Sequence, residues 1–90
     1  MDRVFLYVLR SARDGSFYVG MTSRLQQRLK EHNAGLSPAT RSKRPWQVVY
    51  REECGSHAEG RQREKQLKSG AGRRWLAEQF SFDGDSQPVD

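Results

Sequence analysis

Apolar residues near the start of the chain form one uninterrupted run. Residues 4–9 read Val-Phe-Leu-Tyr-Val-Leu, and this β-branched and aromatic stretch has the length of a strand. An Asp-Gly-Ser turn follows at residues 14–16, since glycine tolerates positive φ and aspartate can accept a hydrogen bond from its own backbone. Residues 17–19 form a short second strand that Gly20 closes. The pattern predicts a hairpin whose first strand is mostly buried.

Helical spacing of apolar residues begins after the hairpin. Leu25 and Leu29 lie one turn apart, and Thr22 or Ser23 would cap the helix that carries them. Residues 33–35, Asn-Ala-Gly, suit a helix end because asparagine and glycine tolerate the left-handed conformation found there. The basic residues of this helix recur at intervals of four and form a stripe beside the apolar seam: Arg24, Arg28 and His32.

A loop and a third strand follow. Residues 36–45 contain two prolines and three basic residues, so they either grip a phosphate backbone or form an ordinary mobile surface loop. Residues 46–52 alternate as a strand does, with three apolar residues on one face, Trp46, Val48 and Tyr50. Trp46 could stack on a base, but its place at a strand start after proline favours core packing.

The last third of the chain is more polar. Ser56 and Glu59 form a capping box for a helix that runs to about residue 69, and charges surround most of this helix. Residues 69–72 contain two glycines and are predicted to end it. Residues 73–78 add one short further turn or helix, whose Trp and Leu pack back on the body.

Length and charge fit one small domain and a tail. A chain of 90 residues buries a modest core, which excludes two domains, and its apolar residues, 34% of the total, cluster as in a folded protein. Residues 1–79 carry all 16 Lys and Arg against 8 acidic residues, a net charge of +8. Residues 80–90 carry only Asp83, Asp85 and Asp90. We therefore expect a basic domain followed by an acidic disordered tail.

A basic domain points to a polyanionic partner, of which a phosphate backbone is the obvious one, with salt-sensitive binding. For any single Lys or Arg the simpler explanation is a solvated helix face, supported by pairs such as Glu64 with Lys68. The only cysteine, Cys54, cannot form an internal disulfide and is assigned a structural role. The chain has neither an apolar run near the ~20 residues of a membrane span nor a signal-peptide pattern, so we expect a cytoplasmic protein.

Four residues carry a family resemblance. Tyr7, Tyr18 in a Tyr-Val-Gly motif, Arg28 on the first helix and Glu64 on the second follow one another in the order and spacing of the GIY-YIG nuclease signature. Over about residues 4–78 the chain resembles the small stand-alone bacterial members of that family. The resemblance implies an α+β fold, with a small three-stranded, mainly antiparallel sheet flanked by helices.

The resemblance also implies divalent-metal-dependent hydrolysis of DNA phosphodiester bonds, in DNA repair or processing. Tyr18 would be the general base, Arg28 would hold the phosphate, and Glu64 would bind Mg²⁺ or Mn²⁺. A phenol acting as base needs positive charge nearby, because its usual pKa is ~10. Tyr7 would shape the site, unless both tyrosines are simply cross-strand neighbours. His32 would hold a phosphate or move a proton, or else be a packed residue.

The candidate contacts to the nucleic-acid backbone are Arg24, Arg41, Lys43, Arg44 and Lys68. The sequence departs from the family pattern at Phe5, where the first glycine would be, and at Met21, where some members carry a lysine. Either Arg24 or His32 replaces that cation, or activity is reduced.

Met21 and the short chain favour one rival, a nucleic-acid-binding module of the same fold that cleaves little or nothing. A weaker rival is a protein-interaction module that works through the acidic tail. DNA is the expected partner and a membrane is not. RNA, a recruiting protein and the oligomeric state are left open by the sequence.

Overall fold

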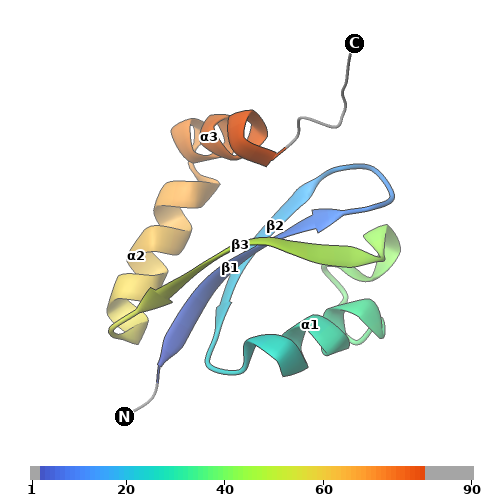
Figure 1. Cartoon of the computed structure of the whole chain (residues 1–90), viewed down its shortest axis with the longest axis horizontal. Helices are drawn as coiled ribbons and strands as arrows, with labels where there is room; N and C mark the ends of the chain where they lie inside the picture. Colours follow the sequence, from blue (N-terminus) through green and yellow to red (C-terminus); the bar gives the residue numbers. More distant parts are fainter. Residues whose placement is uncertain (1–2, 81–90) are drawn as a thin grey trace.

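The computed structural model describes residues 3–80 and contains a hairpin, a third strand and three helices (Figure 1). The elements in chain order are β1 Val4–Ser11, β2 Phe17–Thr22, α1 Leu25–Asn33, the 3-10 turn η1 Arg41–Lys43, β3 Trp46–Cys54, α2 His57–Lys68 and α3 Gly70–Phe80. The predicted hairpin, third strand and two principal helices are all present, and each strand is two or three residues longer than its predicted range.

The three strands form one antiparallel sheet in the order β2-β1-β3, so the first strand is central. This position explains its uninterrupted apolar run, because both faces of β1 are covered. Helix α1 lies on one side of the sheet, and α2 and α3 lie on the other (Figure 1). The α+β class and the small antiparallel sheet are confirmed.

Each face of the sheet has its own core. On the α2 and α3 face the buried residues are Leu6, Val8, Val19, Cys54, Leu67 and Leu76. On the α1 face they are Tyr7, Leu9 and Trp46, with Tyr18, Leu25, Leu29 and Val48 packed against them. Trp46 is 5% exposed, which fits the predicted core packing. The alternation of β1 thus sends its aliphatic residues mainly to one side and Tyr7 to the other.

The third strand does not keep one alternation throughout. Val8 pairs with Tyr50 but the next residue, Leu9, pairs with Val48, which leaves Val49 as an extra residue in β3. This bulge reverses the side-chain alternation, so Tyr50 packs on the α2 and α3 face while Trp46 and Val48 pack on the α1 face. The predicted common face for Trp46, Val48 and Tyr50 is therefore wrong.

Two predicted helix boundaries are also different. The N-cap of α1 is Arg24, without a side-chain cap, and the Thr22 hydroxyl instead accepts from the Arg24 amide at 3.0 Å. Residues 70–72 do not follow the last helix turn but begin α3. Ser69 separates the helices, since its hydroxyl donates to the Gln66 carbonyl at 2.6 Å and accepts from the Gly72 amide at 3.2 Å.

Gly72 allows this sharp connection. A Cβ added there would lie 2.5 Å from the Leu67 Cα and closer still to the Gln66 carbonyl oxygen, so α3 packs directly on the backbone of α2. Leu76 on α3 is 1% exposed and completes the core on this face. Phe80, the first residue of the predicted tail, belongs to α3, and residues 81–90 lie outside the described part. Within residues 3–80 no helix is long and apolar enough to cross a membrane.

Candidate active site

Tyr7 is held at the centre of the α1 face by an opposing glycine. It pairs with Gly20 across the β1 and β2 strands and is 1% exposed. A Cβ added at Gly20 would lie 2.7 Å from the Tyr7 hydroxyl oxygen and 3.1 Å from Cε2 of Tyr18. The glycine of the Tyr-Val-Gly motif therefore makes room for both tyrosine rings.

A buried chain of hydrogen bonds leads away from Tyr7. Its hydroxyl lies 2.9 Å from Nε2 of His32, and Nδ1 of that histidine lies 2.7 Å from Oγ1 of Thr40. Because the Thr40 hydroxyl donates to the Ser37 carbonyl at 3.5 Å, we assign the proton between His32 and Thr40 to Nδ1. Nε2 then accepts from the Tyr7 hydroxyl. His32 and Thr40 are both 0% exposed, so water does not compete for these bonds.

The same burial determines the protonation states of Tyr7 and His32. Burial and the neighbouring Tyr18 raise the pKa of Tyr7 to about 12, although Arg28 acts in the opposite direction. Burial, followed by the positive charge of Arg28, lowers the pKa of His32 below 6.5. At neutral pH Tyr7 is thus a neutral hydrogen-bond donor and His32 a neutral imidazole.

Tyr18 lies beside this chain but is less buried. It pairs with Leu9 on β1, and its ring centroid lies 6.3 Å from that of Tyr7 and 5.1 Å from that of His32. The centroid of the Trp46 ring, on β3 beyond the central strand, lies 6.4 Å from that of Tyr18. Because Tyr18 is partly exposed, it is the phenol of this cluster that a substrate can reach.

Arg28 projects from α1 next to the tyrosines. Its guanidinium pairs with Glu31 at 2.9 Å, and about a third of the side chain is exposed. The hydrogen bond to Glu31 is the main cause of its raised pKa, with further contributions from Tyr7 and Tyr18. Arg28 is therefore a permanent, partly exposed cation beside the two tyrosines, with donors left over for an anion.

Glu64 comes from the other side of the sheet. It lies on α2, and its carboxylate accepts from Nζ of Lys68 at 2.8 Å. Its negative charge is the weakest of the influences on the pKa of Tyr7 and acts to raise it. The hydrogen bond that Glu64 makes among residues 3–80 is to Lys68 on its own helix, which lies on the other side of the sheet from α1 (Figure 1).

The donor set fits a magnesium-type ion but no closed protein cage. Within residues 3–80 no group of three or more His, Cys, Asp and Glu could hold a metal. Mg²⁺ is commonly bound by one or two carboxylates with water and substrate phosphates completing its shell. Glu64, with 24% of its side chain exposed, has the hard oxygen atoms that one such ligand needs.

A family model for the GIY-YIG catalytic domain matches residues 3–75. The chain belongs to the GIY-YIG family. This membership indicates a nuclease-type activity in general, and GIY-YIG nuclease domains generally act on DNA.

Similar proteins carry the name UPF0213 protein. The one from Desulfotalea psychrophila is 41% identical over 66 residues, which are 71% of this chain but 59% of that relative. The one from Bacillus licheniformis is 36% identical over 94% of this chain and 91% of its own length. The NMR structure of the UPF0213 protein from Bacillus halodurans shares the fold, with a TM-score of 0.53 at 23% identity, over 94% of this chain and 99% of that one.

Met21 occupies the position where some GIY-YIG members carry a lysine. A Cβ added to Gly60 would lie 3.2 Å from its sulfur, so Met21 packs under α2. His32 does not replace the missing cation, because it is neutral and both its ring nitrogens are hydrogen-bonded. Arg24 is exposed at the N-terminus of α1 and remains available for that role.

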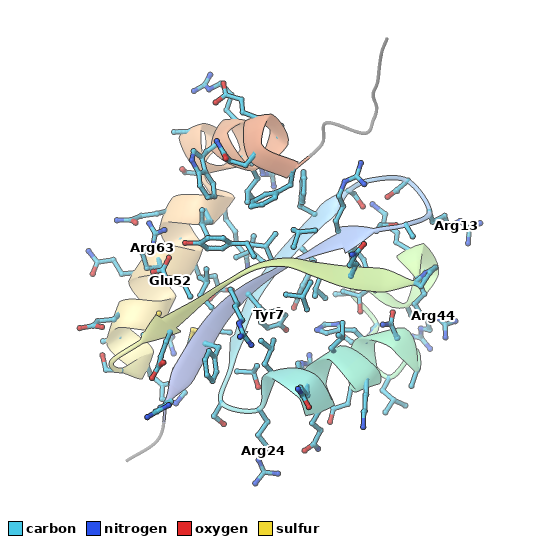
Figure 2. The ribbon with its side chains drawn as sticks, in the orientation of Figure 1. Tyr7, Arg13, Arg24, Arg44, Glu52 and Arg63 are labelled. Atoms are coloured by element: carbon cyan, nitrogen blue, oxygen red, sulfur yellow. The ribbon has the colours of Figure 1, made fainter. Side chains whose placement is uncertain are left out.

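The candidate backbone contacts fall at separate places (Figure 2). Arg24 projects at the start of α1, and Arg44 lies near Arg13 at the opposite end of the sheet. Arg41 and Arg44 line a cleft of about 520 Å³ with Arg13, a residue that the sequence pattern did not single out. Two of the candidates are already paired, Lys43 with Asp14 at 3.6 Å and Lys68 with Glu64.

Sequence reasoning missed the part of the loop that supports the site. Thr40 holds His32, and its carbonyl accepts from the Trp46 indole at 2.8 Å. Asn33 joins α1 to the start of β3 by accepting from the Trp46 amide at 2.6 Å and donating to its carbonyl at 3.1 Å. The loop therefore contributes a buried anchor as well as exposed arginines. Its only sequence cue was a run of hydroxyl residues, which is common in ordinary loops.

Proposed function

We propose that this domain is a divalent-metal-dependent nuclease that hydrolyses DNA phosphodiester bonds in DNA repair or processing. The observation that carries the proposal is the ring cluster of Tyr7, Tyr18 and His32 with Arg28 beside the two tyrosines, and Glu64 joins the proposal through its place in the family signature. A cation, an exposed phenol and a carboxylate are the groups that in-line attack on a phosphodiester requires.

In the proposed reaction Arg28 binds the non-bridging oxygens of the scissile phosphate with a charged, forked donor. Tyr18 acts in its deprotonated, tyrosinate form and becomes a neutral phenol when it takes the proton from the attacking water. Glu64 holds Mg²⁺ or Mn²⁺, which would neutralise phosphate charge and stabilise the departing oxygen. Tyr7 stays protonated and donates to His32, so it fixes the position of the ring cluster instead of acting as base.

Met21 supports a second candidate, a nucleic-acid-binding module of the same fold that cleaves weakly or not at all. An apolar side chain packed under α2 cannot assist the departure of a proton from the attacking group. In this case Arg28 and the exposed arginines would bind phosphates, and the tyrosine cluster would remain as structure.

Cleavage assays distinguish the two candidates. Labelled single-stranded, duplex, flapped and branched DNA, with an RNA strand beside them, is incubated with Mg²⁺, Mn²⁺ or EDTA. We expect metal-dependent cutting that Glu64→Gln and Tyr18→Phe each reduce at least ~100-fold, while DNA binding survives.

Glu78→Gln is the matched control, because this carboxylate is exposed on α3 and we place it outside the site. Binding without cutting on every substrate would establish the second candidate. Cutting that Glu64→Gln leaves unchanged would exclude the proposed metal site.

A further inference from the structure

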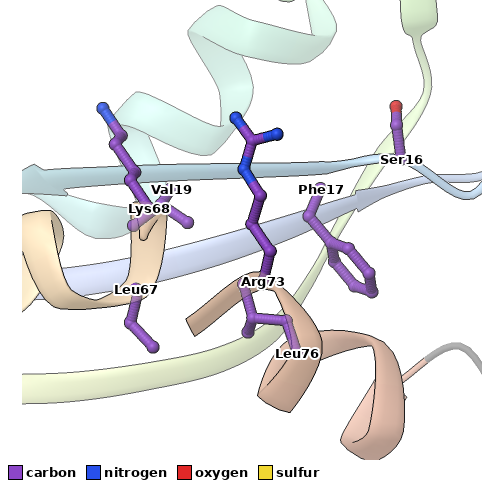
Figure 3. Close-up of a pocket in the computed structure, with 7 residues that line it drawn as sticks. All are labelled: Ser16, Phe17, Val19, Leu67, Lys68, Arg73 and Leu76. Carbon is purple, nitrogen blue, oxygen red and sulfur yellow. The ribbon is translucent and has the colours of Figure 1, made fainter. Parts of the chain in front are cut away.

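A cavity of about 300 Å³ lies between β2, the end of α2 and α3 (Figure 3), on the face of the sheet opposite Tyr7 and Tyr18. Its apolar part is formed by Phe17, Val19, Leu67 and Leu76. Lys68 and Arg73 supply its charged part, and no acidic residue is among the residues that line it. The volume is at the lower end of the ~300–1,000 Å³ range of small-molecule sites.

The charged ends of Lys68 and Arg73 point out of this cavity, where they can bind an anion. Figure 3 shows the ammonium of Lys68 and the guanidinium of Arg73 pointing the same way, across β2, while the Phe17 ring lies on the other side beside Leu76. The Arg73 side chain has no ion pair within residues 3–80. An arginine without an ion pair in the described part of the chain, beside an apolar cavity, favours a ligand with an anionic group joined to a flat apolar body.

The cavity also lies next to the proposed metal ligand. Gly60 at the start of α2 packs against Met21 near the end of β2, and Leu67 at the end of α2 lines the cavity with Phe17 and Val19. Helix α2 therefore follows β2 from its end back toward its start. Glu64 lies between these two points, one helical turn before Lys68, to which it is hydrogen-bonded.

We propose that this cavity takes one unpaired nucleobase of the strand whose phosphodiester lies at Glu64. The base packs against the Phe17 ring, and Arg73 binds the phosphate that joins this base to its neighbour. This inference rests on the proposed function and names its substrate class, a strand that is unpaired beside the bond to be cut. A paired base would first have to be unpaired and unstacked, and this free-energy cost is smallest for a base that is already unpaired.

Binding measured without cleavage tests this site. The full chain in EDTA is titrated with a fluorescent single-stranded oligonucleotide and with a series in which one abasic position moves along the strand. One abasic position should weaken binding about ten-fold, as the loss of a stacked base does. Phe17→Leu, which keeps apolar volume but removes the aromatic face, should weaken binding of the intact strand similarly and leave the sensitive abasic strand unchanged.

The chain offers two matched controls. Phe80→Leu removes an aromatic ring that packs with Tyr50 and Trp75 outside the cavity, so it should not discriminate between intact and abasic strands. Arg73→Gln is compared with Arg74→Gln, the neighbouring exposed arginine that does not line the cavity. Arg73→Gln should lower the slope of log affinity against log salt by about one.

The outcomes separate this inference from the proposed function. If Phe17→Leu weakens binding of intact and abasic strands equally, or if no abasic position weakens binding, the cavity does not bind a base and the inference is wrong. Metal-dependent cutting by the wild-type chain would still support the proposed function in that case. If the wild-type chain neither binds nor cuts any oligonucleotide, the proposed function fails and the inference fails with it.

Discussion

The two faces of the sheet are built on opposite principles. The buried residues under α2 and α3 are aliphatic apart from Cys54, and the two helices approach so closely that glycine is required at Gly72. The face under α1 instead buries a tyrosine hydroxyl, an imidazole and a threonine hydroxyl, each hydrogen-bonded to the next. The first kind of burial is favourable by itself, whereas the second is tolerated only because every polar group finds a partner.

This difference assigns different tasks to the two faces. We infer that the aliphatic face supplies most of the favourable free energy of folding. The polar face contributes less to stability, because burying its polar groups has a cost, but it holds Tyr7 and Tyr18 in fixed positions. Substitutions on the first should therefore change stability most, and substitutions on the second should change activity more than stability.

The largest effect on stability is expected for Gly72→Ala. The new methyl group would meet the backbone of Gln66 and Leu67, which cannot turn away as a side chain can, so α3 must move off α2. We expect a loss of about 3 kcal/mol in the free energy of unfolding, measured by urea denaturation. Gly70→Ala is the control, because a Cβ there has no neighbour within 4 Å. Equal stability of the two variants would contradict the close packing of α3 on α2.

The fold was predictable where local pattern determines it. The central strand, the Asp-Gly turn and the Ser56 cap follow from residue type and spacing, and the Ser56 hydroxyl does accept from the Glu59 amide at 3.2 Å. The bulge in β3 was not predictable, because it depends on pairing with β1 and leaves no local mark in an apolar run. The start of α3 was missed because Gly72, which usually indicates a helix end, is required here by a contact.

Gly20→Ala should lower the cleavage rate much more than it lowers stability. Its methyl group would lie 2.7 Å from the Tyr7 hydroxyl oxygen, so the two rings must shift although the aliphatic core is untouched. We expect at least ~100-fold slower cleavage with a stability loss of about 1–2 kcal/mol. Gly70→Ala serves again as the control, since a Cβ added there has no neighbour within 4 Å. Normal cleavage by Gly20→Ala would show that the ring positions do not matter.

The candidate site was predictable only through its resemblance to a family. Spacing alone placed Arg28 and His32 on one helix face, whereas Glu64 lies on a helix of the opposite layer (Figure 1) and only the family resemblance joins it to the site. Thr40 was not identifiable either, because its task depends on a loop that folds back onto α1. Such contacts arise from tertiary packing, which a single sequence does not display.

Thr40→Val tests the cost of the polar core. Valine keeps the shape of threonine but removes the hydroxyl, so Nδ1 of His32 is left buried without a partner. We expect a loss of about 1–3 kcal/mol by thermal or urea unfolding. Thr40→Ser keeps the hydroxyl and should recover most of that loss. If the Thr40→Val variant is as stable as the Thr40→Ser variant, the hydrogen bonds that lead from Tyr7 to Thr40 do not contribute to stability.

The smallest effect is a pH dependence that belongs to the polar face alone. Burial and then Arg28 lower the pKa of His32 below 6.5 in the folded protein, so the unfolded chain takes up this proton first. The resulting stability is fully present above pH 6.5 and is lost as the pH falls toward the pKa of the folded state, by at most ~1.4 kcal/mol per pH unit. Carboxylates such as Glu52 and Glu31, whose ordinary pKa is 4.5, contribute only in more acidic solution.

The free energy of unfolding, measured between pH 7 and pH 5, should therefore fall with pH in the wild-type chain, and His32→Gln should remove this slope. Gly72→Ala should lower the free energy of unfolding equally at every pH in this range. A slope that survives His32→Gln would place the titrating group outside the hydrogen-bond chain and would remove the contrast between the two faces.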